Sequence, residues 1–342
     1  MTGPRITFGP WGETLEELVA AGRAAEEAGA TTLWVPELHR SATVSAAALA
    51  QGTSTARVGT AIALAFTRSP MTTALEALDL DELSGGRFVL GLGSGVKRLN
   101  EDWHNARWGR PVAHLRETVA AVRHFVAHAA DGAPMTLEGE HEPMRIRGYQ
   151  RPFPQARREI PVYVAGMGPA MTRLAGEIGQ GWISHELCSP AWLTERSLPP
   201  LLEGLAESGR DRSELDVVVS ACCSVDADPG VARRRSAGTA GFYASVRTYA
   251  DFFAFHDLAE DQEKVIEAFR AGAGADYLGD AVSSRMVDAL TLTGTFDQVA
   301  ERISAYAGVA DSIKLTPPVH GVGPADIRAA QARIIELIRE LS

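Results

Sequence analysis

The feature that most constrains the fold is a regular alternation of short runs rich in β-branched residues with longer stretches of helical periodicity. This alternation is typical of a parallel sheet whose strands are joined by helical crossovers. Eight runs fit strands, and eight is the number that a closed (β/α)8 barrel requires. The predicted strands are residues 5–10, 31–37, 57–66, 88–94, 161–167, 181–187, 216–225 and 312–319.

Two segments are longer than a helical crossover needs. Residues 131–160 are rich in proline, glycine and charge, which predicts an inserted loop with a small hairpin. Residues 229–294 are helical in pattern, and we expect them to form a lid over the barrel mouth. We therefore predict an α/β fold: one (β/α)8 TIM-barrel domain over residues 1–342, with these two insertions.

The charge balance restricts the partners. With 33 basic and 43 acidic residues, the net charge is −10, which argues against binding to nucleic acid or to an anionic membrane. No signal peptide or membrane span is visible, so we expect a cytoplasmic protein that acts on a small molecule.

Neither the cysteines nor the histidines show metal-ligand spacing, so no metal is expected. Cys188, Cys222 and Cys223 are interpreted as buried, reduced thiols. The remaining histidines of interest, His104, His114, His124 and His128, are interpreted as surface residues of helices.

Polar residues gather where the predicted strands end, which is where barrel enzymes place their chemistry. The second strand ends in Glu37, with His39 close behind, and the sixth ends in His185 and Glu186. The eighth carries Lys314 and Thr316. Any one of these residues could be an ordinary solvated side chain, but together they indicate an active site.

Two glycine-rich turns also follow strands. The fourth strand leads into Gly93-Ser94-Gly95, and the fifth into Gly166-Met167-Gly168-Pro169 ahead of a helix. Glycine lets the backbone approach a ligand, and a helix N-terminus favours a phosphate. Neither turn has the full dinucleotide fingerprint or the Walker lysine, and such a turn taken alone is more often an ordinary tight turn than a ligand site.

Taken together, four segments resemble the luciferase-like family, most closely its deazaflavin-dependent branch, which includes methylene-tetrahydromethanopterin reductase. The matching segments are residues 34–39, 57–95, 160–183 and 216–228. The resemblance implies a bacterial luciferase-like (β/α)8 barrel that binds coenzyme F420 or flavin mononucleotide (FMN) and pairs as a homodimer.

The resemblance also assigns coenzyme-binding residues. Ala61 and Ile62 match a bulge in the third strand, where the family has a non-prolyl cis peptide behind the coenzyme ring. Residues 93–95 match a segment lining the coenzyme, and residues 166–169 match the backbone that binds its phosphate. Glu37 and His39 match an acidic-histidine pair, although Leu38 separates them here.

The expected activity is hydride transfer between coenzyme F420 and a small organic substrate. Candidates for the proton donor or acceptor are Glu37, His39, His185 and Glu186. Arg68, Lys97 and Arg98 are candidates for binding the anionic tail of the coenzyme. The alternatives are a monooxygenase that uses reduced FMN and, more distantly, a catalytically silent flavin-binding protein.

Overall fold

The computed structural model describes residues 3–342, which divide into two compact units, each assembled from separate stretches of the chain. Unit 1 contains the described residues up to Leu33, then Ser184–Arg196 and Val217–Ser342. Unit 2 contains Trp34–Ile183 and Ser197–Asp216. In both units, parallel strands alternate with helices, as the sequence predicts.

The strands of unit 1 lie in the order β11, β10, β12 and β1, and all of them are parallel. The first half of β2 (Thr32–Val35) follows, because Leu33 pairs with Phe8. The bounds are β1 Arg5–Phe8, β10 Asp216–Val225, β11 Leu292–Gly294 and β12 Ser312–Thr316. In this register Lys314 lies between Thr7 on β1 and Ser220 on β10.

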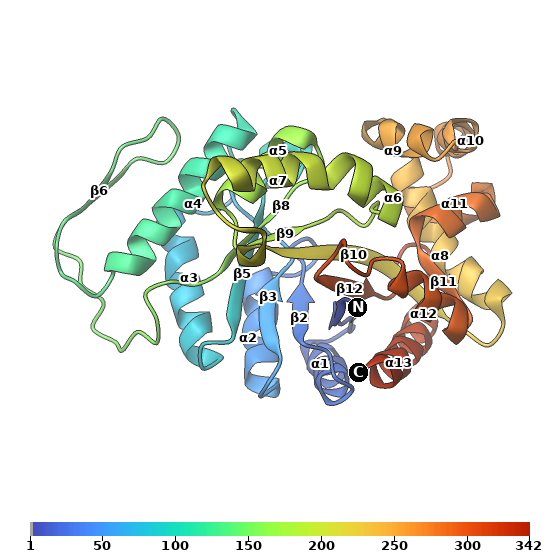
Figure 1. Ribbon diagram of the computed structural model, residues 1–342, viewed down its shortest axis with the longest axis horizontal. Helices are drawn as coiled ribbons and strands as arrows, with labels where there is room; N and C mark the ends of the chain where they lie inside the picture. The colour runs from blue at the N-terminus through green and yellow to red at the C-terminus, as the bar shows by residue number, and fades with distance from the viewer. Residues whose placement is uncertain (1–2) are drawn as a thin grey trace. The chain divides into compact units, whose positions relative to one another are not determined.

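Helices of unit 1 follow these strands, and α8 to α11 come from the segment expected to be a lid (Figure 1). The bounds are α1 Leu15–Glu27, α6 Pro190–Trp192, α8 Pro229–Ala244, α9 Ala250–Phe255, α10 Ala259–Arg270, α11 Ser284–Leu290, α12 Phe296–Ser304 and α13 Pro324–Leu341. The helical pattern expected over residues 229–294 ends before their last residues, where β11 lies. Only three residues long, β11 extends the sheet beside the last residues of β10, too short a run to identify from sequence.

Unit 2 has the parallel strand order β3, β5, β8 and β9, and the short strand β4 pairs with β5. The strand bounds are β3 Arg57–Thr60, β4 Ala63–Leu64, β5 Phe88–Gly93, β8 Val162–Ala165 and β9 Gly181–Ile183. The helix bounds are α2 Ala42–Gly52, α3 Pro70–Leu83, α4 Pro111–His128, α5 Pro169–Ile178 and α7 Leu198–Glu207. Helices α5 and α7 run side by side in this unit (Figure 1).

The hairpin expected within residues 131–160 is present. Strands β6 (Met135–Leu137) and β7 (Met144–Ile146) pair antiparallel and loop out beyond α4 (Figure 1). Its turn is held by Glu117 on α4, whose carboxylate accepts hydrogen bonds from the backbone N–H groups of His141 and Glu142 at 2.6 and 2.9 Å.

The interpretation of His114 as a surface residue was wrong. Its side chain is buried, it stacks on Phe66 with ring centroids 3.9 Å apart, and its Nε2 lies 2.8 Å from Glu142. A histidine on the inner face of an amphipathic helix has the same sequence spacing as a core residue, so only the packing distinguishes the two cases.

Most predicted strands were too long at their carboxyl ends. Residues 9–10, 36–37, 184–187 and 317–319 leave the sheet and form loops. The third predicted strand is also split into β3 and β4 at residues 61 and 62. Among the helices built from residues 3–342, none combines the length and apolar character needed to cross a membrane.

Candidate functional site

Unit 2 brings together most of the residues matched to coenzyme binding. They lie at the carboxyl ends of β3, β5 and β8 and comprise residues 61–64, 93–95 and 166–169, which we call the glycine edge. A cis peptide bond joins Ala61 to Ile62, as the family resemblance predicted. The backbone N–H of Ala61 donates to the Val35 carbonyl at 2.8 Å, and the N–H of Glu37 donates to the Ile62 carbonyl at 3.1 Å. Residues 61 and 62 are therefore bonded to the β2 segment, although they interrupt the strand.

Gly93 lets the ends of three strands meet closely. A Cβ atom at this position would lie 3.0 Å from Cγ1 of Ile62 and 3.4 Å from the Cβ of Ala165. Two residues on, Gly95 has a φ of +64°, and a Cβ there would lie 2.6 Å from Cδ2 of Leu64. Glycine at these two positions therefore lets the side chains of Ile62 and Leu64 pack directly against the backbone that ends β5 and follows it.

Asn100 holds the loop of the glycine edge and was not identified from the sequence. Its side-chain amide donates to the carbonyls of Ser94 and Val96 at 2.7 and 3.0 Å. The side chain is buried, and its Oδ1 has no hydrogen-bond partner among residues 3–342. Asn100 stands alone among charged residues, and no sequence pattern there indicates that its side chain bonds the backbone of the preceding loop.

The third part of the glycine edge is the start of α5. The Gly166 carbonyl accepts a hydrogen bond from the indole of Trp182 at 2.9 Å, which fixes the turn. Gly168 is the N-cap, Pro169 begins the helix, and no side chain caps it. A Cβ atom at Gly168 would have no heavy atom of the described chain within 4 Å, apart from its own chain neighbours. The first N–H groups of α5 are thus accessible to an anion.

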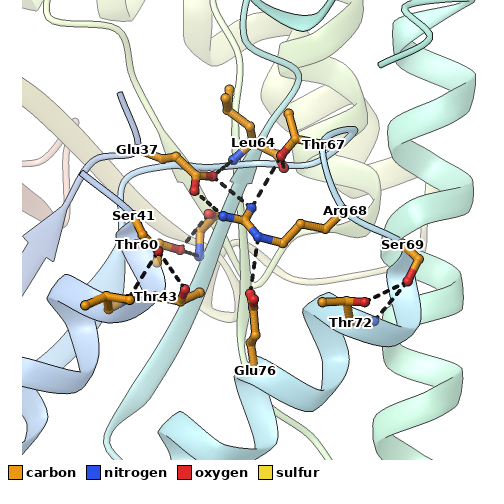
Figure 2. A network of polar contacts seen from close by, with 12 residues as sticks. Glu37, Ser41, Thr43, Thr60, Leu64, Thr67, Arg68, Ser69, Thr72 and Glu76 are labelled. Atoms are coloured by element: carbon orange, nitrogen blue, oxygen red, sulfur yellow. Dashed lines mark hydrogen bonds and ion pairs between the residues drawn. The ribbon is translucent and has the colours of Figure 1, made fainter. Parts of the chain in front are cut away.

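Glu37 lies beside the glycine edge, where Arg68 binds it with both ends of the guanidinium group (Figure 2). The same carboxylate accepts the Leu64 N–H at 2.8 Å, and Nε of Arg68 lies 3.5 Å from Glu76. Burial opposes ionisation of Glu37, but the hydrogen bonds from Arg68 and Leu64 outweigh it and lower the pKa of this carboxyl. Glu76 has its pKa raised, mainly by burial.

The three cationic residues predicted to bind the coenzyme tail differ in their contacts and in their exposure. Arg68 is paired with Glu37 and Glu76, and its binding of the coenzyme tail stays a prediction. Lys97 and Arg98 are exposed on the segment after β5, each paired with an acidic residue four positions later. His39 is exposed as well.

Unit 1 contains a second polar cluster, which is centred on Glu186 in the loop before α6. The hydroxyls of Tyr243 and Thr316 each donate to its carboxylate at 2.9 Å. Burial acts to raise the pKa of Glu186, but the charge of Lys314, the two hydroxyls and His185 together lower it. Tyr243 comes from α8, in the segment where sequence analysis identified no site residue.

Two further groups complete this cluster. His185 lies between the rings of Tyr243 and Tyr249, with centroids 4.7 and 4.8 Å away, and burial lowers its pKa to about 4. Its Nδ1 accepts the Leu187 N–H at 3.1 Å, so the neutral ring carries its proton on Nε2. Lys314 is buried, and burial lowers the pKa of its ammonium group while the Glu186 charge opposes that change.

A cavity of about 380 Å³ in unit 1 reaches Glu186. Its walls include Cys188, Ala221, Leu292 and Tyr306, and Asp288 lies at the exposed end. A space of this size accommodates a small organic molecule.

Comparison with known proteins agrees with this architecture. The family model described as luciferase-like monooxygenase matches residues 2–312. An uncharacterised protein of Mycobacterium tuberculosis is 32% identical over 298 residues, covering 86% of this chain and 87% of that protein. The 5,10-methylenetetrahydromethanopterin reductase of Methanolobus tindarius is 27% identical over 292 residues, covering 82% and 84%.

Two solved structures show the fold. The coenzyme F420-dependent tetrahydromethanopterin reductase of Methanopyrus kandleri matches with a TM-score of 0.84 at 23% identity, covering 99% of this chain and 98% of that one. The oxygenating constituent of 3,6-diketocamphane monooxygenase from Pseudomonas putida, in complex with FMN, matches with a TM-score of 0.68 at 19% identity, covering 99% and 97%. The chain therefore belongs to the luciferase-like monooxygenase family and has its (β/α)8-barrel fold.

Proposed function

We propose that this protein is an oxidoreductase that transfers hydride between coenzyme F420 and a small organic substrate. The observation that carries the proposal is the glycine edge of unit 2, where Gly93 and Gly95 pack closely against Ile62 and Leu64 and the uncapped start of α5 is open. Relatives named as F420-dependent enzymes and as reductases of the methanopterin type support F420 as the coenzyme.

Each part of the glycine edge has a proposed role. Ala61 and Ile62 support the coenzyme ring, and residues 93–95 line it. The phosphate is bound by Gly166, Met167, Gly168 and Pro169, through the open N–H groups of the first turn of α5. The exposed Lys97 and Arg98 bind the anionic tail. The coenzyme, when bound, supplies a carbon centre that accepts or gives a hydride.

The proton-transfer role falls to Glu186, because its lowered pKa keeps it ionised at neutral pH. An ionised carboxylate suits the direction in which the substrate is oxidised. The substrate then loses a C–H hydride to the coenzyme and an O–H or N–H proton to Glu186. In this role the neutral His185 donates a hydrogen bond through Nε2, and His39 remains a second candidate for proton transfer.

The test is a parallel titration of the purified protein with coenzyme F420 and with FMN, followed by absorbance and by quenching of intrinsic fluorescence. Tighter binding of F420 is expected. A preference for FMN would replace the proposal with the reduced-flavin monooxygenase, which the Pseudomonas putida neighbour represents. Binding of F420 without hydride exchange under any substrate would instead favour a silent coenzyme-binding protein.

The family resemblance supports three further proposals. The chain forms a homodimer, it acts in the cytoplasm, and it is one domain in which residues 229–294 act as a lid over the bound substrate. Light scattering coupled to size exclusion tests the first, cell fractionation the second, and limited proteolysis with and without coenzyme the third. Protection of residues 229–294 by coenzyme and substrate is the expected result.

A further inference from the structure

Glu37 contacts the coenzyme-binding strip of unit 2 through both its backbone and its side chain. Its N–H donates to the Ile62 carbonyl at 3.1 Å, and its carboxylate accepts the Leu64 N–H at 2.8 Å. The strip from residue 62 to residue 64 is therefore bonded at two points to one residue of the β2–α2 loop.

Arg68 fixes the carboxylate that makes the second of these contacts. Its Nη1 donates to Oε2 of Glu37 at 2.9 Å, and its Nη2 bonds Oε1. The exposed fractions are 9% for the Glu37 side chain and 19% for that of Arg68, so water competes little for this pair. A bidentate guanidinium–carboxylate pair fixes orientation as well as distance.

Glu76 limits how Arg68 can move. Its carboxylate lies 3.5 Å from Nε, on the side of the guanidinium group that faces away from Glu37 (Figure 2). With one carboxylate on each side, the guanidinium plane has little freedom to rotate.

We infer that Glu37 and Arg68 form a positioning pair that sets the geometry of residues 62–64 for coenzyme binding, and that Glu37 takes no part in proton transfer. Both carboxylate oxygens are already bonded, so a substrate would have to displace Arg68 or the Leu64 N–H to reach them. The coenzyme part of this inference rests on the proposed function, whereas the effect on the backbone does not.

The test compares Glu37→Gln and Arg68→Lys with a matched control, Arg157→Lys. Arg157 also makes a bidentate ion pair in unit 2, donating to Oδ2 and Oδ1 of Asp81 at 3.1 and 2.6 Å, and no hydrogen bond among the described residues joins either residue to residues 61–64. Three quantities are measured: amide hydrogen exchange at Leu64 without coenzyme, the Kd for F420, and the pH dependence of kcat. Arg68→Lys keeps the positive charge, so it serves if Glu37→Gln fails to fold.

Both test variants are expected to exchange faster at Leu64 and to bind F420 about 5- to 150-fold more weakly, the usual range for coupling between two positions. The acid limb of their pH profiles should not move. The control should lose thermal stability with Leu64 exchange and Kd unchanged. Loss of the acid limb in Glu37→Gln, or an unchanged Kd together with faster exchange, would overturn the inference. If the wild type itself does not bind F420, the proposed function fails, and Leu64 exchange still decides whether the pair positions the strip.

Discussion

Glu37 in unit 2 and Glu186 in unit 1 both follow a strand and both have a lowered pKa, but different donors surround them. Glu37 is bound by a guanidinium fork and a backbone N–H. Glu186 is bound by two hydroxyls, and the cation that stabilises its charge, Lys314, makes no direct hydrogen bond to it among the contacts of the described residues.

The difference teaches how one residue type can serve two purposes. A guanidinium fork bonds both carboxylate oxygens in a fixed geometry, which suits a residue that holds the backbone in place. A hydroxyl can rotate away and either donate or accept, so it can follow a change in the charge of its neighbour. Glu186 also lines the cavity of unit 1.

The largest expected effect comes from removing the charge of Glu186. Glu186→Gln should lower kcat by about 10²- to 10⁴-fold, the range for a general acid or base, and should leave the Kd for F420 unchanged. Single-turnover absorbance of the coenzyme measures the first quantity and fluorescence titration the second. Asp288→Asn is the control, because it removes a carboxylate at the exposed end of the same cavity. If Glu186→Gln turns over at the wild-type rate, Glu186 takes no part in proton transfer and does not differ from Glu37 in this respect.

The second prediction concerns His185 and the pH dependence of the free energy of unfolding. Burial lowers its folded pKa to about 4 from an ordinary value of 6.5, so the unfolded chain binds the extra proton between these values. The free energy of unfolding should therefore fall as the pH is lowered from 6.5 to 4, by up to roughly 3 kcal/mol from this one group. Denaturant titrations of His185→Gln should show a flatter dependence over that window. His128→Gln, on the exposed face of α4, is the control for the loss of a histidine side chain.

Gly168 tests the phosphate end of the glycine edge. Its φ is −77° and a Cβ would meet open space, so Gly168→Ala should fold with wild-type stability. Binding of F420 should weaken by about tenfold, near 1.4 kcal/mol, because the methyl group occupies the approach to the helix N-terminus. Gly323→Ala is matched to it, since Gly323 also caps a helix that begins with proline and also has open space. If the two variants bind F420 with equal affinity, the coenzyme phosphate does not bind at the start of α5.

Tyr243 gives the smallest expected effect. Tyr243→Phe removes a hydroxyl that stabilises ionised Glu186, so the pKa of Glu186 should rise. The decline of kcat/KM on the acid side should then begin up to about one pH unit higher. In Tyr306→Phe, where the lost hydroxyl bonds the Cys188 carbonyl at 2.7 Å, the acid limb should stay in place. If the acid limb of kcat/KM shifts in both variants, the limb reports a change in the cavity as a whole and not the ionisation of Glu186 alone.

The sequence predicted the parts of the site that depend on local chemistry. The glycines at 93, 95, 166 and 168 and the acidic and imidazole groups after the strands were identified, because such residues are uncommon in the middle of regular elements. The cis peptide at Ala61 and Ile62 was predicted by family resemblance alone, since nothing in the run RVGTAIALAF distinguishes it from an ordinary buried strand.

The roles that depend on distant partners were missed. Tyr243 lies 57 residues from Glu186, and Arg68 lies 31 residues from Glu37, so no local pattern links either pair. Asn100 and His114 were missed for a related reason, because their burial depends on how a helix packs and not on its own residues.

By itself, the sequence determined the alternation of strands and helices, the hairpin insertion and the positions where polar residues follow strands, because these depend on neighbouring residues and on hydrophobic periodicity. Only the tertiary structure decided which carboxylate is held by arginine and which by hydroxyls. Parallel strands separated by long crossovers bring together side chains from distant parts of the chain, and their burial and partners set the charge that each one carries.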